Sequence, residues 1–455
     1  MLDRPGLASQ EHAGVWWLPS EPGRTVGGRL TFAPAEGLRL DLIGVLGGGR
    51  PGVRHDIVLG TTVDGEPITL ESAAQGGRRE VSSVWLPAPV VAEVLLPQHA
   101  YIGAHLPLPD QRRFASGIIE LDDLADWMEA WPFKDEYGPH PVVFAVSYAH
   151  PEEIRAPFDL GEIIISPSAR EFGDGIRERG IRASVAFVVR LKEAQPIVWW
   201  LQQIVRPLQN LLTFVGDRPS SVTRFALLQL ERNIDVLYQP SGPDRAGRRL
   251  YSHEFLFHPR EVAERMPTML AKWFELATEL APVIDSFIGM RYRPVFAENR
   301  FLNVVGALEA YHRRRYPNTV IPSSEHRVRR KRILSRAPEE DRDWLGERLC
   351  YSNEPSLRMR LADLLVRPKD AYLPSILGSN ELIGPTVDLR NRLIHQDPRR
   401  SARAVNPFDL WVLTERLTLL LLACLLDELG ISGSQLRDVI VRSVRFRQLS
   451  EAGMP

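Results

Sequence analysis

The spacing of apolar residues changes near Pro259, and this change limits the possible folds more than any other feature of the chain. Up to about residue 190, short runs such as "LRLDLIGVL" and "ASVAFVVRL" are separated by Gly, Pro and Asp, which is typical of a β-sandwich or barrel. Beyond Pro259, apolar residues recur at helical spacing. A chain of 455 residues is also too long for one core. We therefore predict an α+β multidomain protein, with a β-rich N-terminal region followed by an all-α helical bundle.

Mixed elements are expected between these two parts. "PIVWWLQQIVRPLQNLLTFVG" predicts a helix kinked at Pro207, and "RFALLQLE", "NIDVLYQP" and "HEFLFHP" alternate as strands do. Helices are then expected at 260–288, 297–316, 338–350, 355–366, 385–396, 407–429 and 433–446. The basic segment "EHRVRRKR" (325–332) is expected to lie between helices. We predict a β-rich region over 1–290, which can comprise subdomains 1–190 and 191–290, and a helical domain over 291–455.

Charge is distributed unevenly between the two predicted regions. Residues 291–455 hold 28 basic and 20 acidic residues, a net charge of +8, whereas the remainder has a net charge of −9. A basic C-terminal part suggests a polyanion as partner. The alternative is that salt-bridged surfaces happen to be distributed in this way. Most of the basic residues are arginine, which suits phosphate but also follows from a GC-rich genome.

Cysteine content and hydropathy point to a soluble protein of the cytoplasm. Cys350 and Cys424 both lie in apolar, helical surroundings, where buried thiols are expected. The N-terminal stretch has no apolar core for a signal peptide. The apolar run "LTLLLLACLL" (417–426) is about half as long as a membrane span, so we interpret it as a central buried helix.

Several familiar motifs are absent or incomplete. "GGGRPG" (47–52) lacks the Lys-Ser/Thr of a phosphate loop and is interpreted as a hairpin turn. The pairs His99/His105 and His253/His258 have neither cysteines nor clustered carboxylates beside them. We therefore expect no metal site and no cofactor.

The stretch "LRNRLIHQD" (389–397) places Arg390, Asn391 and His395 on one predicted helix. Gly384-Pro385 can start this helix and Pro398 disfavours its continuation, so His395 falls in the last turn. The C-terminal end of a helix carries partial negative charge, which favours the protonated imidazole of His395, whereas the positive charge of the nearby arginines disfavours it. The pKa of His395 can therefore stay near neutrality, where histidine works best as an acid or base. A solvated helix end that happens to contain a histidine is the alternative.

The same helix predicts how the motif is arranged. Asn391 lies one turn before His395 and can hold its ring, whereas Arg390 lies about 140° around the helix and needs its long side chain to reach the same phosphate. Val387, Leu389, Leu393 and Ile394 are expected on the buried side, with part of this surface available to a partner. One histidine supplies half of an acid–base pair, and a symmetric second copy would supply the other half.

Two parts of the chain resemble a known family. "RNRLIH" is similar to the Arg-Asn-x-x-x-His form of the motif in HEPN ribonucleases, and about 150 helical residues surround it. The N-terminal pattern "GVWWLP...VGGRLTF...GLRLDLIG" resembles the N-terminal domain of ApeA-type proteins, which are bacterial defence proteins with a C-terminal HEPN domain.

The resemblance implies metal-independent cleavage of RNA, with tRNA as the expected substrate, in abortive infection against phage. His395 would move the proton, Arg390 would stabilise the charged phosphorane, and Asn391 would orient the histidine or the substrate. We also expect Arg392, Arg399 and Arg400 to contact RNA. The implied assembly is a homodimer joined through the HEPN helices. The N-terminal region is expected to sense a phage-derived trigger or to restrain the HEPN domain. The alternative is a non-catalytic HEPN module that binds nucleic acid or protein in a defence or toxin–antitoxin system. A toxin whose N-terminal part is its own inhibitor is compatible with the ribonuclease.

Overall fold

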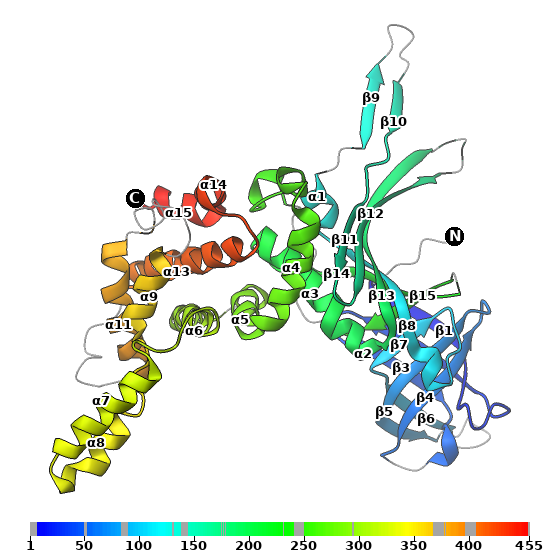
Figure 1. The fold of residues 1–455 in the computed structure, drawn as a ribbon. Helices are drawn as coiled ribbons and strands as arrows, with labels where there is room; N and C mark the ends of the chain where they lie inside the picture. Colours follow the sequence, from blue (N-terminus) through cyan, green and yellow to red (C-terminus); the bar gives the residue numbers. More distant parts are fainter. Residues whose placement is uncertain are drawn as a thin grey trace. The chain divides into compact units, whose positions relative to one another are not determined.

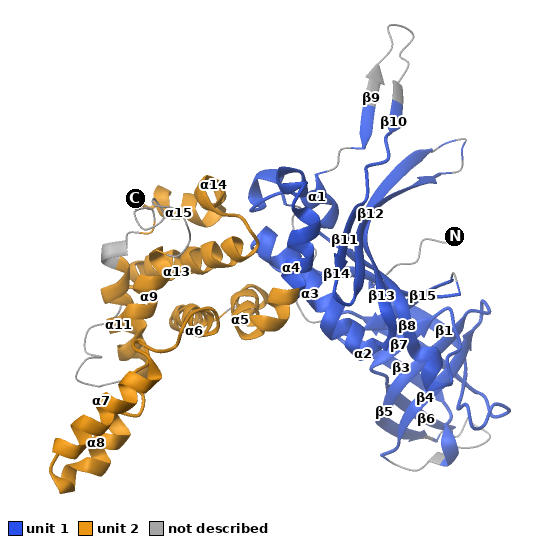
Figure 2. Ribbon diagram, in the orientation of Figure 1, with its two compact units in different colours: residues 1–274 blue, residues 275–455 orange. Residues whose placement is uncertain are grey.

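The structure, a computed structural model, divides the chain into two compact units, residues 1–274 (unit 1) and 275–455 (unit 2) (Figures 1 and 2). It describes residues 7–49, 52–82, 90–129, 132–137, 144–173, 175, 177, 179–230, 232–240, 250–293, 295–366, 377, 379–395 and 406–453. Unit 1 is β-rich and unit 2 is helical, which confirms the predicted fold class. The boundary expected at 290/291 falls inside α5 (Ala281–Tyr292) of unit 2.

Six strands of unit 1 form a closed barrel. They are β1 (Gln10–Trp17), β2 (Val26–Ala33), β3 (Gly37–Ile43), β4 (Arg54–Thr62), β5 (Pro67–Val81) and β6 (Val90–Leu96). Their order is β5-β4-β1-β2-β3-β6, and pairing of β5 with β6 closes the ring. Trp16 is fully buried and lies against Gly60, where a Cβ atom would be 2.2 Å from the indole ring. Only glycine therefore fits at position 60. Of the sandwich or barrel expected from the alternating runs, the structure has the barrel.

The barrel continues into a larger sheet at Pro97. One edge of β5 pairs first with β7 (His99–Ile102), through Glu71 opposite His99, and then with β6, through Ala74 opposite Leu96. β6 and β7 therefore behave as one long strand interrupted at Pro97, which has no N–H for a sheet ladder. On the far side, β6 pairs with β3 and closes the barrel, whereas β7 pairs with β15 and starts the extension.

The extension adds six strands beyond β7, in the order β15-β14-β8-β13-β12-β11. They are β8 (Arg113–Leu121), β11 (Ile154–Phe158), β12 (Gly161–Phe172), β13 (Gly180–Pro196), β14 (Val222–Gln229) and β15 (Arg232–Tyr238). A separate hairpin consists of β9 (Phe133–Tyr137) and β10 (Phe144–Tyr148). Helix α1 (Leu124–Met128) follows β8, and α2 (Ile197–Trp200) and α3 (Arg206–Gly216) follow β13. Trp200 of α2 donates a hydrogen bond to the Phe114 carbonyl of β8 (2.9 Å), which fixes the helix to the sheet.

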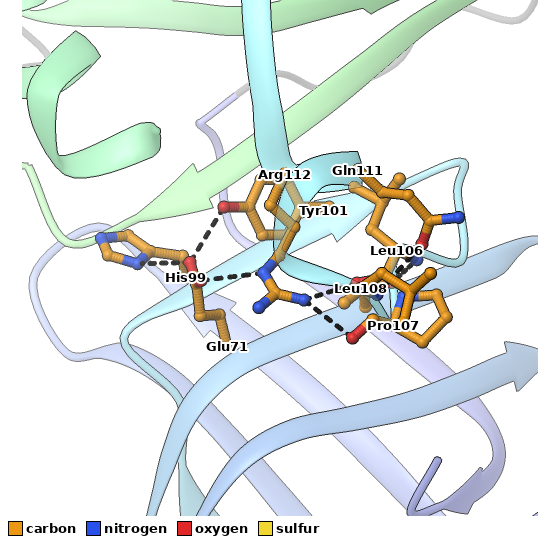
Figure 3. Close-up of polar contacts among 9 residues, drawn as sticks. Glu71, His99, Tyr101, Leu106, Pro107, Leu108, Gln111 and Arg112 are labelled. Carbon is orange, nitrogen blue, oxygen red and sulfur yellow. Dashed lines mark hydrogen bonds and ion pairs between the residues drawn. The ribbon is translucent and has the colours of Figure 1, made fainter. Parts of the chain in front are cut away.

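A buried polar cluster lies where β5 of the barrel pairs with β7, the strand that leads into the extension (Figure 3). Glu71 accepts hydrogen bonds from the Tyr101 hydroxyl (2.9 Å) and Arg112 Nε (3.1 Å), and lies 3.5 Å from His99 Nδ1. Arg112 also donates to the carbonyls of Leu106 (2.8 Å) and Pro107 (3.1 Å). Burial disfavours the charged form of Glu71, but hydrogen bonds from His99 and Tyr101, with the charges of His99 and Arg112, outweigh it and lower its pKa. The ion pairs and hydrogen bonds of this cluster therefore hold together β5, β7 and the loop that follows β7.

Unit 2 is a helical bundle around α13 (Pro407–Glu428), and α4 (Met266–Glu279) leads into it across the unit boundary. The other helices are α5, α6 (Ala297–Arg315), α7 (Ser323–Arg336), α8 (Arg342–Arg348), α9 (Leu357–Val366), α11 (Ser379–His395), α14 (Gly433–Arg442) and α15 (Val444–Glu451). Asn406 accepts a hydrogen bond from the Phe408 amide (3.0 Å) and caps α13, as its sequence indicates. The run 417–426 is buried, which confirms the prediction of a central helix.

Three sequence-based predictions are wrong in detail. "HEFLFHP" (253–259) runs from the 3-10 turn η4 (Ser252–Glu254) to the 3-10 turn η5 (Pro259–Val262) and contains no strand. Residues 255–259 are all buried, whereas a strand with one exposed face would alternate. The expected kink at Pro207 is replaced by a π-helical segment, Leu201–Val205, directly before α3. Segment 325–332 is not a link between helices, because it lies inside α7.

Candidate active site

Helix α11 carries the Arg-x4-His motif and packs against α9, α13 and α6. Its buried side consists of Leu382, Thr386 and Leu389, at the i, i+4, i+7 spacing of one helical face. The helix begins at Ser379, before the expected start, and therefore contains Pro385. The Thr386 hydroxyl donates to the Leu382 carbonyl (2.6 Å), so the turn around the proline keeps a hydrogen bond inside the buried face.

The motif residues occupy the last turns of this helix. Arg390, Asn391 and Arg392 are half-buried, and His395 is the final residue of α11. The structure describes the backbone of His395, and its side chain lies outside what is described, as do Arg399 and Arg400. Arg390 and His395 therefore share one helix, about 140° apart around its axis.

The Arg390 guanidinium is held by two neighbours. Nη1 donates to the Asn391 side-chain oxygen (3.2 Å), and Nη2 lies 3.7 Å from Oε2 of Glu309 on α6. The Arg390 and Glu309 side chains are 30% and 29% exposed, so the pair lies at the border of protein and solvent. A guanidinium has five N–H donors, and the outward ones can reach an anionic ligand. Asn391, expected to hold the His395 ring or the substrate, contacts Arg390 in this structure.

The apolar surface of α11 differs from the expectation in one position. Leu389 is buried and Val387 and Leu393 are half-buried, but Ile394 is 50% exposed. Ile394 follows Leu393 by 100° and thus turns away from the face that packs on α9 and α13. The apolar surface of α11 therefore reaches solvent next to the motif histidine.

A second histidine of unit 2, His312 on α6, is buried in a polar network that sequence reasoning missed. Its Nε2 lies 2.9 Å from Asp363 Oδ2 on α9, and its Nδ1 lies 3.1 Å from Arg360. Arg360 is also bonded to the Asn318 side chain (2.5 Å), and burial, then the charge of Arg313, lowers its pKa. Because both ring nitrogens of His312 are occupied and the side chain is 3% exposed, His312 holds α6 against α9 and is not accessible to a ligand at the surface.

Glu309 and His312 were missed because their partners are distant in the sequence. Glu309 lies 81 positions before Arg390, and His312 lies 51 before Asp363. The only local signal is that both residues fall near the end of a predicted helix, three positions apart, which places them on one face. That spacing does not indicate which helix the face contacts.

Unit 1 contains a hollow of about 890 Å³, whose lining includes Phe133, Tyr148 and Tyr251. Its charged lining residues, Asp126 and Glu129, are acidic, which opposes binding of phosphate. Cys350 is exposed, contrary to expectation, because it follows the wholly unburied helix α8, whereas Cys424 is buried in α13. Among the residues with described positions, no group of three or more His, Cys, Asp or Glu side chains is arranged to hold a metal ion.

Residues 11–273 match the family described as ApeA N-terminal domain 1, and residues 302–435 match the one described as Apea-like HEPN. The chain belongs to the ApeA family. No curated protein and no solved structure matches it. The HEPN match covers all of α9 and α11 and all but the first residues of α6. Glu309, Arg390 and His395 therefore all lie within the ApeA-like HEPN domain.

The family match confirms the resemblance seen in "RNRLIH" and in the N-terminal pattern. ApeA-type proteins with HEPN domains have roles in antiviral defence, and HEPN domains in general are ribonucleases. No helix within the described ranges is long and apolar enough to span a membrane.

Proposed function

We propose that this ApeA-family chain is a metal-independent endoribonuclease that acts in abortive infection against phage. The observation that carries the proposal is the placement of Arg390 and His395 on one helix of the HEPN domain, with Arg390 half-buried and held beside Asn391 and Glu309. A guanidinium fixed at the surface is suited to a phosphate, because its donors are already oriented before the ligand arrives.

The chemistry follows from the groups present. One imidazole removes the proton of the ribose 2′-hydroxyl, and the oxygen attacks the adjacent phosphorus. The bond from phosphorus to the 5′-oxygen breaks, a second acid protonates that oxygen, and the products are a 2′,3′-cyclic phosphate and a 5′-hydroxyl. Arg390 stabilises the added negative charge of the phosphorane. Asn391 keeps the guanidinium oriented, and Arg392, Arg399 and Arg400 contact neighbouring phosphates of the RNA.

We propose a homodimer joined through the HEPN helices as the active form. The reaction needs both a base and an acid, whereas one α11 supplies one histidine. Two-fold pairing brings two copies of His395 to one cleft from a single sequence. The exposed Ile394 beside the motif supports an apolar contact there. The proposed substrate is tRNA in the cytoplasm, and the β-rich region restrains the HEPN domain until a phage-derived trigger binds.

The decisive experiment incubates the purified full chain with total tRNA in EDTA and analyses the RNA ends. We expect cleavage with cyclic phosphate and 5′-hydroxyl ends. His395→Ala and Arg390→Ala should abolish it while the melting temperature stays that of the wild type, and Arg390→Lys should restore only part of the rate because a point charge lacks the fork. RNA binding without cleavage would instead support the non-catalytic binding module.

A further inference from the structure

Helices α7 and α8 form an arm, residues 320–353, that contributes nothing to the core of unit 2. No residue of either helix is buried, and Figure 1 shows both extending away from α13. The base of the arm is closed by backbone and amide bonds: the Val320 amide donates to the Asn353 carbonyl (2.8 Å), and the Asn353 side chain bonds to both polar groups of the Ile321 backbone (3.0 and 2.9 Å). The arm therefore has a defined base and presents its remaining side chains to solvent.

The arm is strongly basic along α7, which holds six Lys or Arg residues against one acidic residue. One side of α7 and the start of α8 enclose an open hollow of about 490 Å³, lined by Arg327, Arg330, Lys331, Leu334, Ser335 and Arg342. No carboxylate lines it. The three cationic residues of α7 follow the i, i+3, i+4 spacing of one helix face, so their convergence results from the helical register.

Two of the four cations of this hollow are held by backbone carbonyls, and neither of these contacts neutralises a charge. Arg330 donates to the Gly346 carbonyl (3.0 Å) and Arg342 to the Ala337 carbonyl (3.1 Å). Arg330 Nε is buried without a hydrogen-bond partner in the described structure. Across the described ranges, none of the four cationic side chains of the hollow forms an ion pair. Four like charges around one space repel one another, and an anion placed among them removes that cost.

We propose that this hollow binds the phosphate backbone of RNA, away from the cleavage motif. The guanidinium fork matches phosphate in a bidentate way, and a lysine adds a point charge. The same arm exposes Trp344 (59%) and Tyr351 (74%), whose flat rings suit stacking of unpaired bases. The inference rests on RNA being the substrate of the HEPN domain, and it assigns a second contact to that substrate. An acidic protein surface, including the arm of a second copy, is the competing occupant.

The test measures binding of the full-length His395→Ala protein to a single-stranded RNA oligonucleotide over a range of salt concentrations. Arg327→Gln combined with Lys331→Gln removes two cations of the hollow. A plot of log association constant against log salt concentration has a negative slope. We expect this slope to become shallower by about 1.4 in the double variant, which corresponds to about tenfold weaker binding at physiological salt. The matched control, Arg332→Gln with Arg336→Gln, makes the same charge change about 140° around α7, outside the hollow, and should have a clearly smaller effect.

Three results would overturn the proposal: wild-type affinity and slope in the double variant, an equal loss in the control, or a change of oligomeric state in light scattering while RNA affinity stays unchanged. The last would mark the arm as a protein interface. Cleavage by the wild-type chain separates this proposal from the proposed function. If the wild type cuts RNA and the double variant binds normally, only the arm is wrongly assigned. If the wild type never cuts RNA but the double variant still binds tenfold more weakly, the arm is supported and the ribonuclease proposal fails.

Discussion

Replacing Glu309 by glutamine should slow RNA cleavage modestly, because Glu309 positions Arg390 and does not touch the substrate. The closest charged atoms are 3.7 Å apart, which at an effective dielectric constant of 20 corresponds to about 4.5 kcal/mol of attraction. Both side chains are about 30% exposed, so solvent screening reduces the net contribution to about 1 kcal/mol. The bond from Arg390 to Asn391 remains. The variant should therefore lose up to about fivefold in rate. Removal of the guanidinium in Arg390→Ala should cost at least about 10² to 10³-fold, enough to abolish detectable cleavage.

Single-turnover cleavage of tRNA at low and high salt measures this effect. The difference between Glu309→Gln and wild type should shrink at high salt, because partly exposed ion pairs are screened. Glu298→Gln is the matched control, since Glu298 is an exposed acidic residue in the first turn of the same helix α6. A loss as large as that of Arg390→Ala would give Glu309 a direct chemical role. No loss at either salt concentration would refute the positioning argument.

Three further expectations test other parts of the molecule. Glu71→Gln should lower the free energy of unfolding of unit 1 by about 3 kcal/mol at neutral pH in urea titrations, because it leaves the largely buried Arg112 side chain without its charged partner. The folded pKa of Glu71 is lowered, so its carboxylate stabilises the fold above the unfolded pKa, and the difference between variant and wild type should shrink as the pH falls through the folded pKa. Mixing wild type with excess His395→Ala subunits, after exchange, should depress cleavage below the fraction of wild-type chains, whereas full activity of a monomer at nanomolar concentration would exclude a composite site. Residues 275–455 expressed alone should be more toxic to cells than the full chain, and a well-folded but less active fragment would show that unit 1 recruits substrate instead.

Elements with a clear apolar period were predictable, and those without one were not. The strands of the barrel and the buried helix α13 follow the alternation and the apolar run in the sequence. Helix α7 was missed because its three large apolar residues, Val328, Ile333 and Leu334, do not recur at helical spacing and so form no apolar stripe. Closure of the barrel was beyond sequence reasoning, since the pairing of β5 with both β6 and β7 depends on register between separate strands and on the break at Pro97.

The motif helix illustrates how packing outweighs a local signal. Gly384-Pro385 predicts a helix start, since proline in a helix interior costs about 3 kcal/mol. Leu382 lies before the proline and is fully buried, and full burial of a leucine side chain contributes about 2 kcal/mol. With the Thr386 bond to the Leu382 carbonyl, this burial offsets most of the cost and extends α11 back to Ser379. The contacts of Leu382, Thr386 and Leu389 with the bundle therefore set the rotation of α11, and with it the direction in which Arg390 points toward Glu309.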